Sequence, residues 1–184
     1  MKKLFLPLLL ALPSLLPATV ITFDDLPNGT SAPPVPSNYA GVTWDASWFY
    51  WTPIGTPAKS DPNIAYFNQA NDAGFNFAAP VSFDGAWFSG FTQPTSVQFD
   101  LFLSNTLVHS SSLLALTQVS TFLDAGYLGD VDRVQIHIVG GLTQWVVDDI
   151  TFNAPSGVPE PSTLVLLPVG LGAVLAFRRK RAAH

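Results

Sequence analysis

Apolar and polar side chains alternate with a period of two through the central part of the chain, residues 20–153. In residues 96–103 every second side chain is apolar, while Gln98 and Asp100 occupy the opposite face. Residues 133–139 repeat the same alternation. Successive side chains of a β-strand point to opposite faces, so both segments predict antiparallel strands with one buried and one solvated face.

Further short segments rich in apolar, β-branched or aromatic residues lie between turn-forming residues, which is typical of strands. They are residues 20–23, 41–44, 48–51, 65–68, 81–88, 106–112, 118–122 and 145–152. About ten short strands and almost no helical periodicity predict an all-β domain over residues 19–153. We expect an antiparallel two-sheet sandwich of the jelly-roll kind.

Two long loops that each contain several prolines are predicted between these strands, at residues 26–38 and 52–63. Loops of this length in a compact domain are often functional. A plain surface crossover is the equally good alternative.

The charge of the chain differs sharply between its ends and its centre. Charged residues make up 11% of the 184 residues, against roughly 25% in an ordinary soluble domain. Between residues 19 and 155, Lys59 and Arg133 stand against twelve aspartates, a formal charge of −10. Phosphate binding needs clustered Lys and Arg, so we expect no nucleic-acid partner.

The sequence offers little to an enzyme. It has no cysteine, which excludes disulfides, thiolate metal sites and cysteine nucleophiles. Gly-x-Ser-x-Gly, His-Glu-x-x-His and phosphate-binding glycine motifs are also missing from it. We therefore expect a protein that is not an enzyme. The alternative is a surface glycoside hydrolase using paired aspartates, because two carboxylates about 5 to 9 Å apart suffice for that chemistry.

The N-terminus has the pattern of a secretory signal peptide. Lys2 and Lys3 precede an apolar run from Leu4 to Leu16, which is too short to span a bilayer comfortably. We expect residues 1–18 to be the signal peptide and the central domain to be exported.

The C-terminus has three successive parts after a short linker, residues 154–158. Pro159, Glu160 and Pro161 come first, and an apolar segment predicts a hydrophobic helix over residues 163–177. The basic residues that follow it are Arg178, Arg179, Lys180 and Arg181. A helix of this length is about 22 Å long, short for roughly 30 Å of hydrocarbon, and its basic flank should stay cytoplasmic.

This tail, residues 159–184, resembles the PEP-CTERM sorting signal of Gram-negative bacteria, which combines a Pro-Glu-Pro motif, a short hydrophobic helix and a terminal basic cluster. The resemblance implies an exosortase-type processing enzyme as partner. It also implies an inner-membrane-anchored precursor, and then attachment or release at the cell surface or in an exopolysaccharide matrix. An ordinary single-span anchor is the alternative.

Two acidic doublets lie where the domain begins and ends, Asp24-Asp25 and Asp148-Asp149. The alternation places Asp148 inward with its apolar neighbours, and Asp25 inward with Phe23. A buried carboxylate is costly unless it is paired, and a calcium ion accepts such oxygen ligands. The alternative is that the aspartates cap turns and accept backbone N–H bonds.

The same two stretches are similar to the opening and closing residues of calcium-binding jelly-roll domains, such as the MAM type and several carbohydrate-binding modules. In those domains the first and last strands pair and hold a structural ion. The resemblance implies a structural Ca²⁺ that involves Asp24, Asp25, Asp148 or Asp149.

Aromatic residues cluster in the segment Trp48-Phe49-Tyr50-Trp51, with Trp87 further along the chain. Alternation puts Trp48 and Tyr50 on one face and Phe49 and Trp51 on the other, so one pair should be buried. Exposed rings in such a domain can stack on sugars. Trp48, Tyr50, Trp51 and Trp87 are the candidate glycan-binding residues of a structural, adhesive or exopolysaccharide-binding surface protein. Packing of these rings between the sheets is the alternative.

Overall fold

The computed structural model describes residues 18–53, 57–68, 72–91, 95–140 and 145–153. These residues form strands, turns and irregular segments and contain no helix, so none of them could cross a membrane as a long apolar helix. The linker, the C-terminal tail and all of the signal peptide except Ala18 fall outside the described residues.

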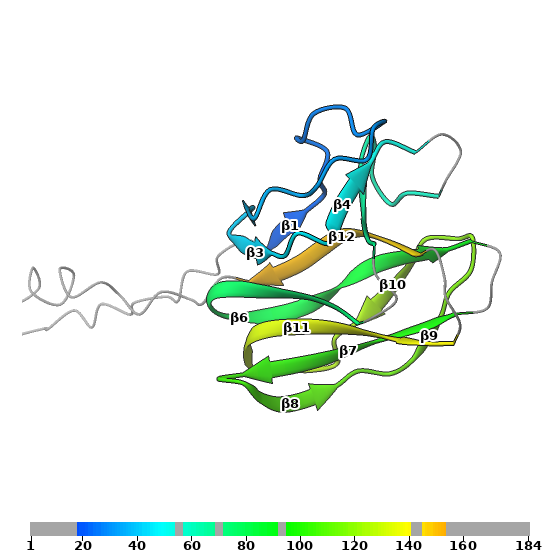
Figure 1. The fold of residues 1–184 in the computed structure, drawn as a ribbon. Coiled ribbons are helices and arrows are strands. Elements are labelled where there is room, and N and C mark those ends of the chain that lie inside the picture. Colours follow the sequence, from blue (N-terminus) through cyan, green and yellow to red (C-terminus); the bar gives the residue numbers. More distant parts are fainter. Residues whose placement is uncertain (1–17, 54–56, 69–71, 92–94, 141–144, 154–184) are drawn as a thin grey trace, which may run out of the picture.

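The strands form one antiparallel hydrogen-bonded network (Figure 1). They are β1 (Thr19–Ile21), β2 (Asn38–Tyr39), β3 (Val42–Trp44), β4 (Trp48–Trp51), β5 (Ile64–Phe67), β6 (Ala73–Gly90), β7 (Ser96–Leu103), β8 (Thr106–Ser110), β9 (Leu114–Ala115), β10 (Thr121–Asp124), β11 (Asp130–Val139) and β12 (Trp145–Asn153). The expected all-β, antiparallel fold is confirmed.

The network has two parts, and strand β6 belongs to both because its two halves pair with different strands. Residues 73–82 pair with β3 and β11, and residues 82–90 pair with β12 and β10. In Figure 1, β6 curves strongly between the two. We call β1, β4, β5, β10, β12 and the second half of β6 the β12 half, and the remaining strands with the first half of β6 the β11 half.

Aromatic side chains fill the core between the two halves. The ring of Phe88, in the β12 half, lies 5.6 Å from that of Phe99 on β7. Phe83 meets Phe99 edge-on at 5.0 Å, and Trp48 on β4 meets Phe75 of the β11 half at 6.3 Å. Edge-on contacts of this kind add to the energy of burial, so these rings hold the buried faces of the two halves together.

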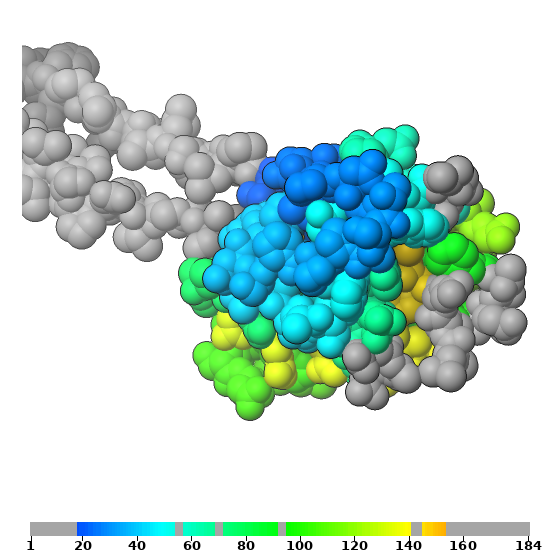
Figure 2. Space-filling model, turned by 45° about the horizontal axis from the view of Figure 1, so that its top comes forward, coloured from blue at the N-terminus to red at the C-terminus, as the bar shows by residue number. Residues whose placement is uncertain are grey.

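The described part of the chain that precedes β4 covers one side of the domain. Val35 donates its backbone N–H to the carbonyl oxygen of Trp48 at 2.9 Å, and the carbonyl oxygen of Pro33 accepts the N–H of Tyr50 at 3.0 Å. Figure 2 shows this part of the chain, coloured blue to cyan, as a continuous surface beside the orange of β12. The outer edge of β4 is therefore not free to pair with another chain.

The observed strands match most of the predicted ones, and residues 48–51 and 96–103 match in both bounds. The first half of β6 was not predicted, although Ala73, Phe75 and Phe77 alternate with other residues. Gly74 and Pro80 argue against a strand there. Pro80 is accommodated because the β6–β11 register shifts beside it, from Val81–Val131 to Asn76–Arg133, and a bulge tolerates proline.

Gly85 gives a testable consequence of this strand geometry. Its φ is +144°, and a Cβ built there would overlap the carbonyl oxygen of Leu123 on β10. We expect Gly85→Ala to lower the free energy of unfolding by more than about 1 kcal/mol, measured by urea denaturation. Gly74→Ala is the matched control in the same strand, since its nearest neighbour is the carbonyl oxygen of Val134 at 3.6 Å. Equal free energies of unfolding for the two variants would contradict the close approach of Gly85 to β10.

Candidate functional site

One face of the β12 half points away from the core. Directly paired residues of antiparallel strands point to the same face. The pairs Phe49–Tyr66, Asp148–Trp87 and Trp87–Phe122 therefore share a face, opposite to the buried face that carries Trp48. This outer face belongs to β4, β5, β12, β6 and β10.

The outer face carries partly exposed aromatic side chains. They are Phe49, Trp51, Tyr66, Trp87 and Phe122, and we call them the outer aromatic face. Phe49 and Tyr66 are stacked, with ring centroids 5.8 Å apart and planes at 25°. Trp87 and Phe122 lie 5.6 Å apart at 57°. The rings therefore form two groups, one on β4 and β5 and one on β6 and β10.

A segment of the second long loop, residues 57–63, crosses the outer face between the two groups, and we call it the strap. The hydroxyl of Ser89 donates to the carbonyl oxygen of Pro57 at 2.8 Å. At the other end, the side-chain amide of Asn63 donates to the carbonyl oxygens of Phe23 and Leu26, both at 3.0 Å. The strap thus contacts Ser89 and Asp148, which are buried although they lie on the outer face, where Ile64 and Val146 are buried as well.

Asp148 holds the middle of the strap. Its Oδ2 accepts the backbone N–H groups of Lys59 and Ser60, both at 2.8 Å, and its Oδ1 accepts the N–H of Asp149 at 2.8 Å. Burial raises the pKa of Asp148 to about 7, and the N–H bonds from Ser60, Asp149 and Lys59 oppose this rise. The carboxylate therefore stabilises the strap at the cost of its own desolvation.

The other three candidate calcium ligands are also engaged by protein donors. Asp24 accepts the N–H of Asn63 at 2.9 Å, Asp149 accepts the hydroxyl of Ser60 at 3.0 Å, and Asp25 accepts the hydroxyl of Tyr39. Within the described ranges, no group of three or more His, Cys, Asp or Glu side chains is placed to hold a metal. Calcium binding stays a prediction. Asp24 and Asp148 accept backbone N–H bonds, which is the arrangement given as the alternative to calcium binding.

The first and last strands pair as expected, with Ile21 opposite Ile150. Asp148 is buried, but the strap covers it and it does not face the core. The prediction that Asp25 points inward is wrong, because its side chain is exposed. Phe23 adopts a left-handed conformation with φ of 63°, which ends the strand alternation before Asp25 is reached.

Two of the candidate glycan-binding residues are corrected by the structure. Trp48 and Tyr50 are 0% and 5% exposed, so neither ring can stack on a sugar. The indole N–H of Trp48 donates to the carbonyl oxygen of Gly74 at 2.8 Å, inside the domain. Packing between the halves, the alternative for these rings, is what the structure shows at both positions.

Trp51 and Trp87 remain accessible in part, and in the described part of the chain their indole N–H groups donate no hydrogen bond. The ammonium of Lys59, on the strap, lies 4.2 Å from the centroid of the Trp87 ring. Phe49, Tyr66 and Phe122 were not predicted. The alternation in residues 48–51 already placed Phe49 beside Trp51, but Tyr66 and Phe122 join the face only through strand register.

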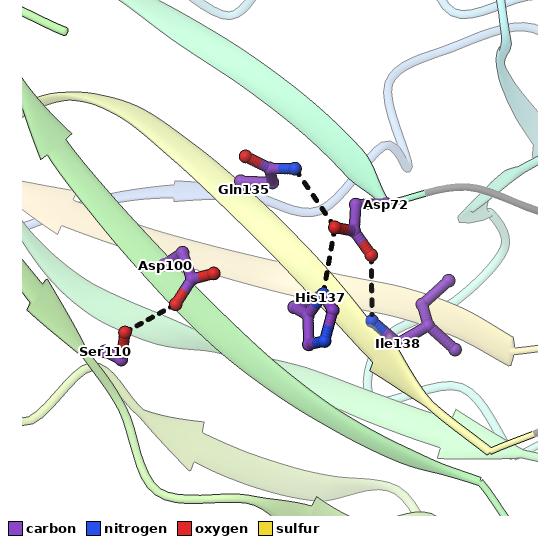
Figure 3. Close-up of polar contacts among 6 residues, drawn as sticks. All are labelled: Asp72, Asp100, Ser110, Gln135, His137 and Ile138. Atoms are coloured by element: carbon purple, nitrogen blue, oxygen red, sulfur yellow. Dashed lines mark hydrogen bonds and ion pairs between the residues drawn. The ribbon is translucent and has the colours of Figure 1, made fainter. Parts of the chain in front are cut away.

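A polar cluster on β11 centres on the carboxylate of Asp72 (Figure 3). One oxygen of Asp72 is 2.9 Å from Nδ1 of His137 and accepts Gln135 at 3.2 Å, while the other accepts the N–H of Ile138 at 3.2 Å. The hydrogen bond to Asp72 raises the pKa of His137. These contacts tie β11 to the start of β6. They do not test the alternative of a glycoside hydrolase that uses paired aspartates, which stays a prediction.

The raised pKa of Asp148 predicts how stability depends on pH. The folded protein binds the proton of the Asp148 carboxyl more tightly than the unfolded chain does, because the pKa of this group in the unfolded chain has its ordinary value of 3.8. The contribution of Asp148 to the free energy of unfolding is therefore fully present below about pH 4 and is lost as the pH rises through 7. We expect the free energy of unfolding of Asp148→Asn to lack this fall, which amounts to at most about 4 kcal/mol.

The measurement is urea unfolding of parent and variant from pH 4 to 8. His137 also contributes a loss of stability above pH 6.5, so the difference between the two profiles is the quantity to compare. Parallel profiles in a calcium-free buffer would contradict the account. Parallel profiles only when calcium is added would indicate that Asp148 ligates the ion, which would keep the carboxylate ionised.

Comparison with known proteins gives one structural likeness. No family model matches the chain, and no curated protein matches it. A solved structure, TmCBM61 in complex with beta-1,4-galactotriose, is similar to this chain with a TM-score of 0.39 and 13% sequence identity. The match covers 73% of this chain and 99% of the other. A likeness this distant assigns the chain to no family.

Proposed function

We propose that this protein is an exported, non-catalytic carbohydrate-binding protein whose domain binds a polysaccharide through the outer aromatic face. The observation that supports this most is the gathering of partly exposed aromatic rings on a single face of the β12 half. Flat rings with free N–H or O–H groups suit sugars, which present apolar C–H faces and hydroxyl edges. We further propose that the two halves are the layers of a jelly-roll-like sandwich.

The charge of the domain favours a neutral polysaccharide. The formal charge of −10 between residues 19 and 155 repels polyanions at low ionic strength. The two cations in that segment lie over aromatic rings, Lys59 over Trp87 and Arg133 over Phe102 at 3.9 Å. A neutral glycan requires no charge partner, so the glycan class follows from the same composition that disfavours nucleic acid.

The location proposed for this binding is the cell surface or the extracellular matrix. The signal peptide, residues 1–18, would export the domain, and the tail would anchor the precursor in the inner membrane until an exosortase-type enzyme acts near Pro159-Glu160-Pro161. A polysaccharide-binding domain attached in this way would link the cell surface to its exopolysaccharide.

Affinity electrophoresis tests the binding directly. Gels containing galactan, xylan, hydroxyethyl cellulose or dextran serve as neutral probes, and alginate serves as the anionic probe. We expect at least one neutral polymer to retard the protein and alginate not to. Trp51→Ala should weaken that binding about tenfold, which corresponds to about 1.4 kcal/mol for a lost ring contact.

Phe102→Ala is the matched control, because Phe102 is a partly exposed ring on the β11 half. It should bind as the parent does, and circular dichroism should show that both variants are folded. No retardation by any of these polymers, or equal loss in the two variants, would count against the outer aromatic face as the binding site.

Sorting is tested by the mass of the mature protein in the surface fraction of its native host. We expect the parent chain to lack the residues after the Pro159-Glu160-Pro161 motif. A variant with all three residues changed to alanine should keep Phe177 and Arg178. A parent chain that retains these residues would instead indicate a simple membrane anchor.

A further inference from the structure

The two aromatic groups are connected by one row of residues across the strands. Trp51 pairs with Ile64 on β5, and Asp148 on β12 pairs with Trp87 on β6. Because Ala65 pairs with Val147, the neighbouring Ile64 and Asp148 also lie opposite each other. Trp87 in turn pairs with Phe122 on β10. Trp51 and Trp87 therefore stand at two points of a single line perpendicular to the strands.

The separation along this line is larger than one sugar ring. Neighbouring strands are about 4.8 Å apart, so the three spacings from β4 to β6 place Trp51 and Trp87 about 14 Å apart. A monosaccharide can contact one of these rings at a time. A chain of several sugar residues laid along the row reaches both.

The surface between the two rings is polar because the strap lies there. Ile64 and Asp148, between the two rings in the row, are 0% and 2% exposed, and the strap bonds to Asp148 through the N–H groups of Lys59 and Ser60. The strap's own side chains Lys59 and Asp61 are exposed. Along the row the surface thus changes from an aromatic ring to charged and hydrogen-bonding groups and back to an aromatic ring. This order suits a sugar chain that stacks at two positions and presents hydroxyl groups between them.

Resting on the proposed function, we propose that the ligand is an internal stretch of a neutral polysaccharide chain, lying across β4, β5, β12 and β6 from Trp51 to Trp87. One sugar ring stacks on Trp51 and another on Trp87, while Lys59 and Asp61 bond the hydroxyls between them. Lys59 lies over the Trp87 ring in the free protein. A sugar that stacks on that side displaces the Lys59 side chain and leaves its ammonium free to donate to hydroxyls.

Chain length is the property that this arrangement makes measurable. A disaccharide occupies one ring, whereas a longer oligomer engages both, and its second contact forms at high effective concentration. Affinity should therefore rise at least tenfold from the disaccharide to oligomers long enough to span the row, and then level off. A site for chain ends, or a site at one ring, would lack this rise.

The experiment is isothermal titration of the full-length protein with galacto-, xylo- or cello-oligosaccharides of increasing length, chosen by the polymer that retards the protein in gels. We expect Trp51→Ala and Trp87→Ala each to abolish the gain with length while keeping disaccharide binding at the remaining ring. Phe102→Ala should keep the full gain. If Trp87→Ala fails to fold, Trp87→Phe and Lys59→Ala replace it, because both leave an aromatic ring at position 87. Each should change the rise in affinity with chain length and leave the affinity for the disaccharide unchanged.

Two failures are distinguishable. Binding of a polymer with no dependence on length, or a long oligomer bound by Trp87→Ala as tightly as by the parent, overturns the extended site and leaves the proposed function standing. No binding of any polymer or oligomer overturns both.

Discussion

The carboxylate of Asp148 is the constraint on which the outer surface of the domain depends. Its Oδ2 accepts the backbone N–H groups of Lys59 and Ser60 and so holds the strap over β12. The strap is also bonded to Ser89 on β6, so it lies over a part of the outer face where Ile64 and Val146 are buried too. It also divides the outer aromatic face into two groups. A buried carboxyl group, whose ionised form is costly to bury, thus fixes the segment that lies over this part of the sheet.

The tryptophans show the same division between structure and surface. Trp44 and Trp48 are buried, and their indole N–H groups donate to the carbonyl oxygens of Tyr39 and Gly74. These rings meet each other edge-on at 5.1 Å and form part of the core. Trp51 is adjacent in sequence to this core, yet alternation turns it outward. The same short strand therefore supplies both packing energy and the proposed contact surface.

The sequence predicted the strands well where alternation was clear, as in residues 48–51 and 96–103. It predicted less about the site, because burial of an outer face depends on which segment crosses it. Asp148 lies under residues 57–63, far away in sequence, and no local pattern shows that contact. Asp25 departs from the expected direction because Phe23 takes a left-handed conformation. Tyr66 and Phe122 join the outer aromatic face only through pairing between distant strands.

The central claim is that Trp51 and Trp87 contact a glycan while the core tryptophans do not. The most direct test is a titration of the isotope-labelled protein followed by its indole N–H signals in two-dimensional NMR spectra. With an oligosaccharide of the retarding polymer, the account predicts shifts of the Trp51 and Trp87 signals, with those of Trp44 and Trp48 unchanged. Shifts confined to Trp44 or Trp48, or no shift at all under conditions where the polymer binds, would contradict it.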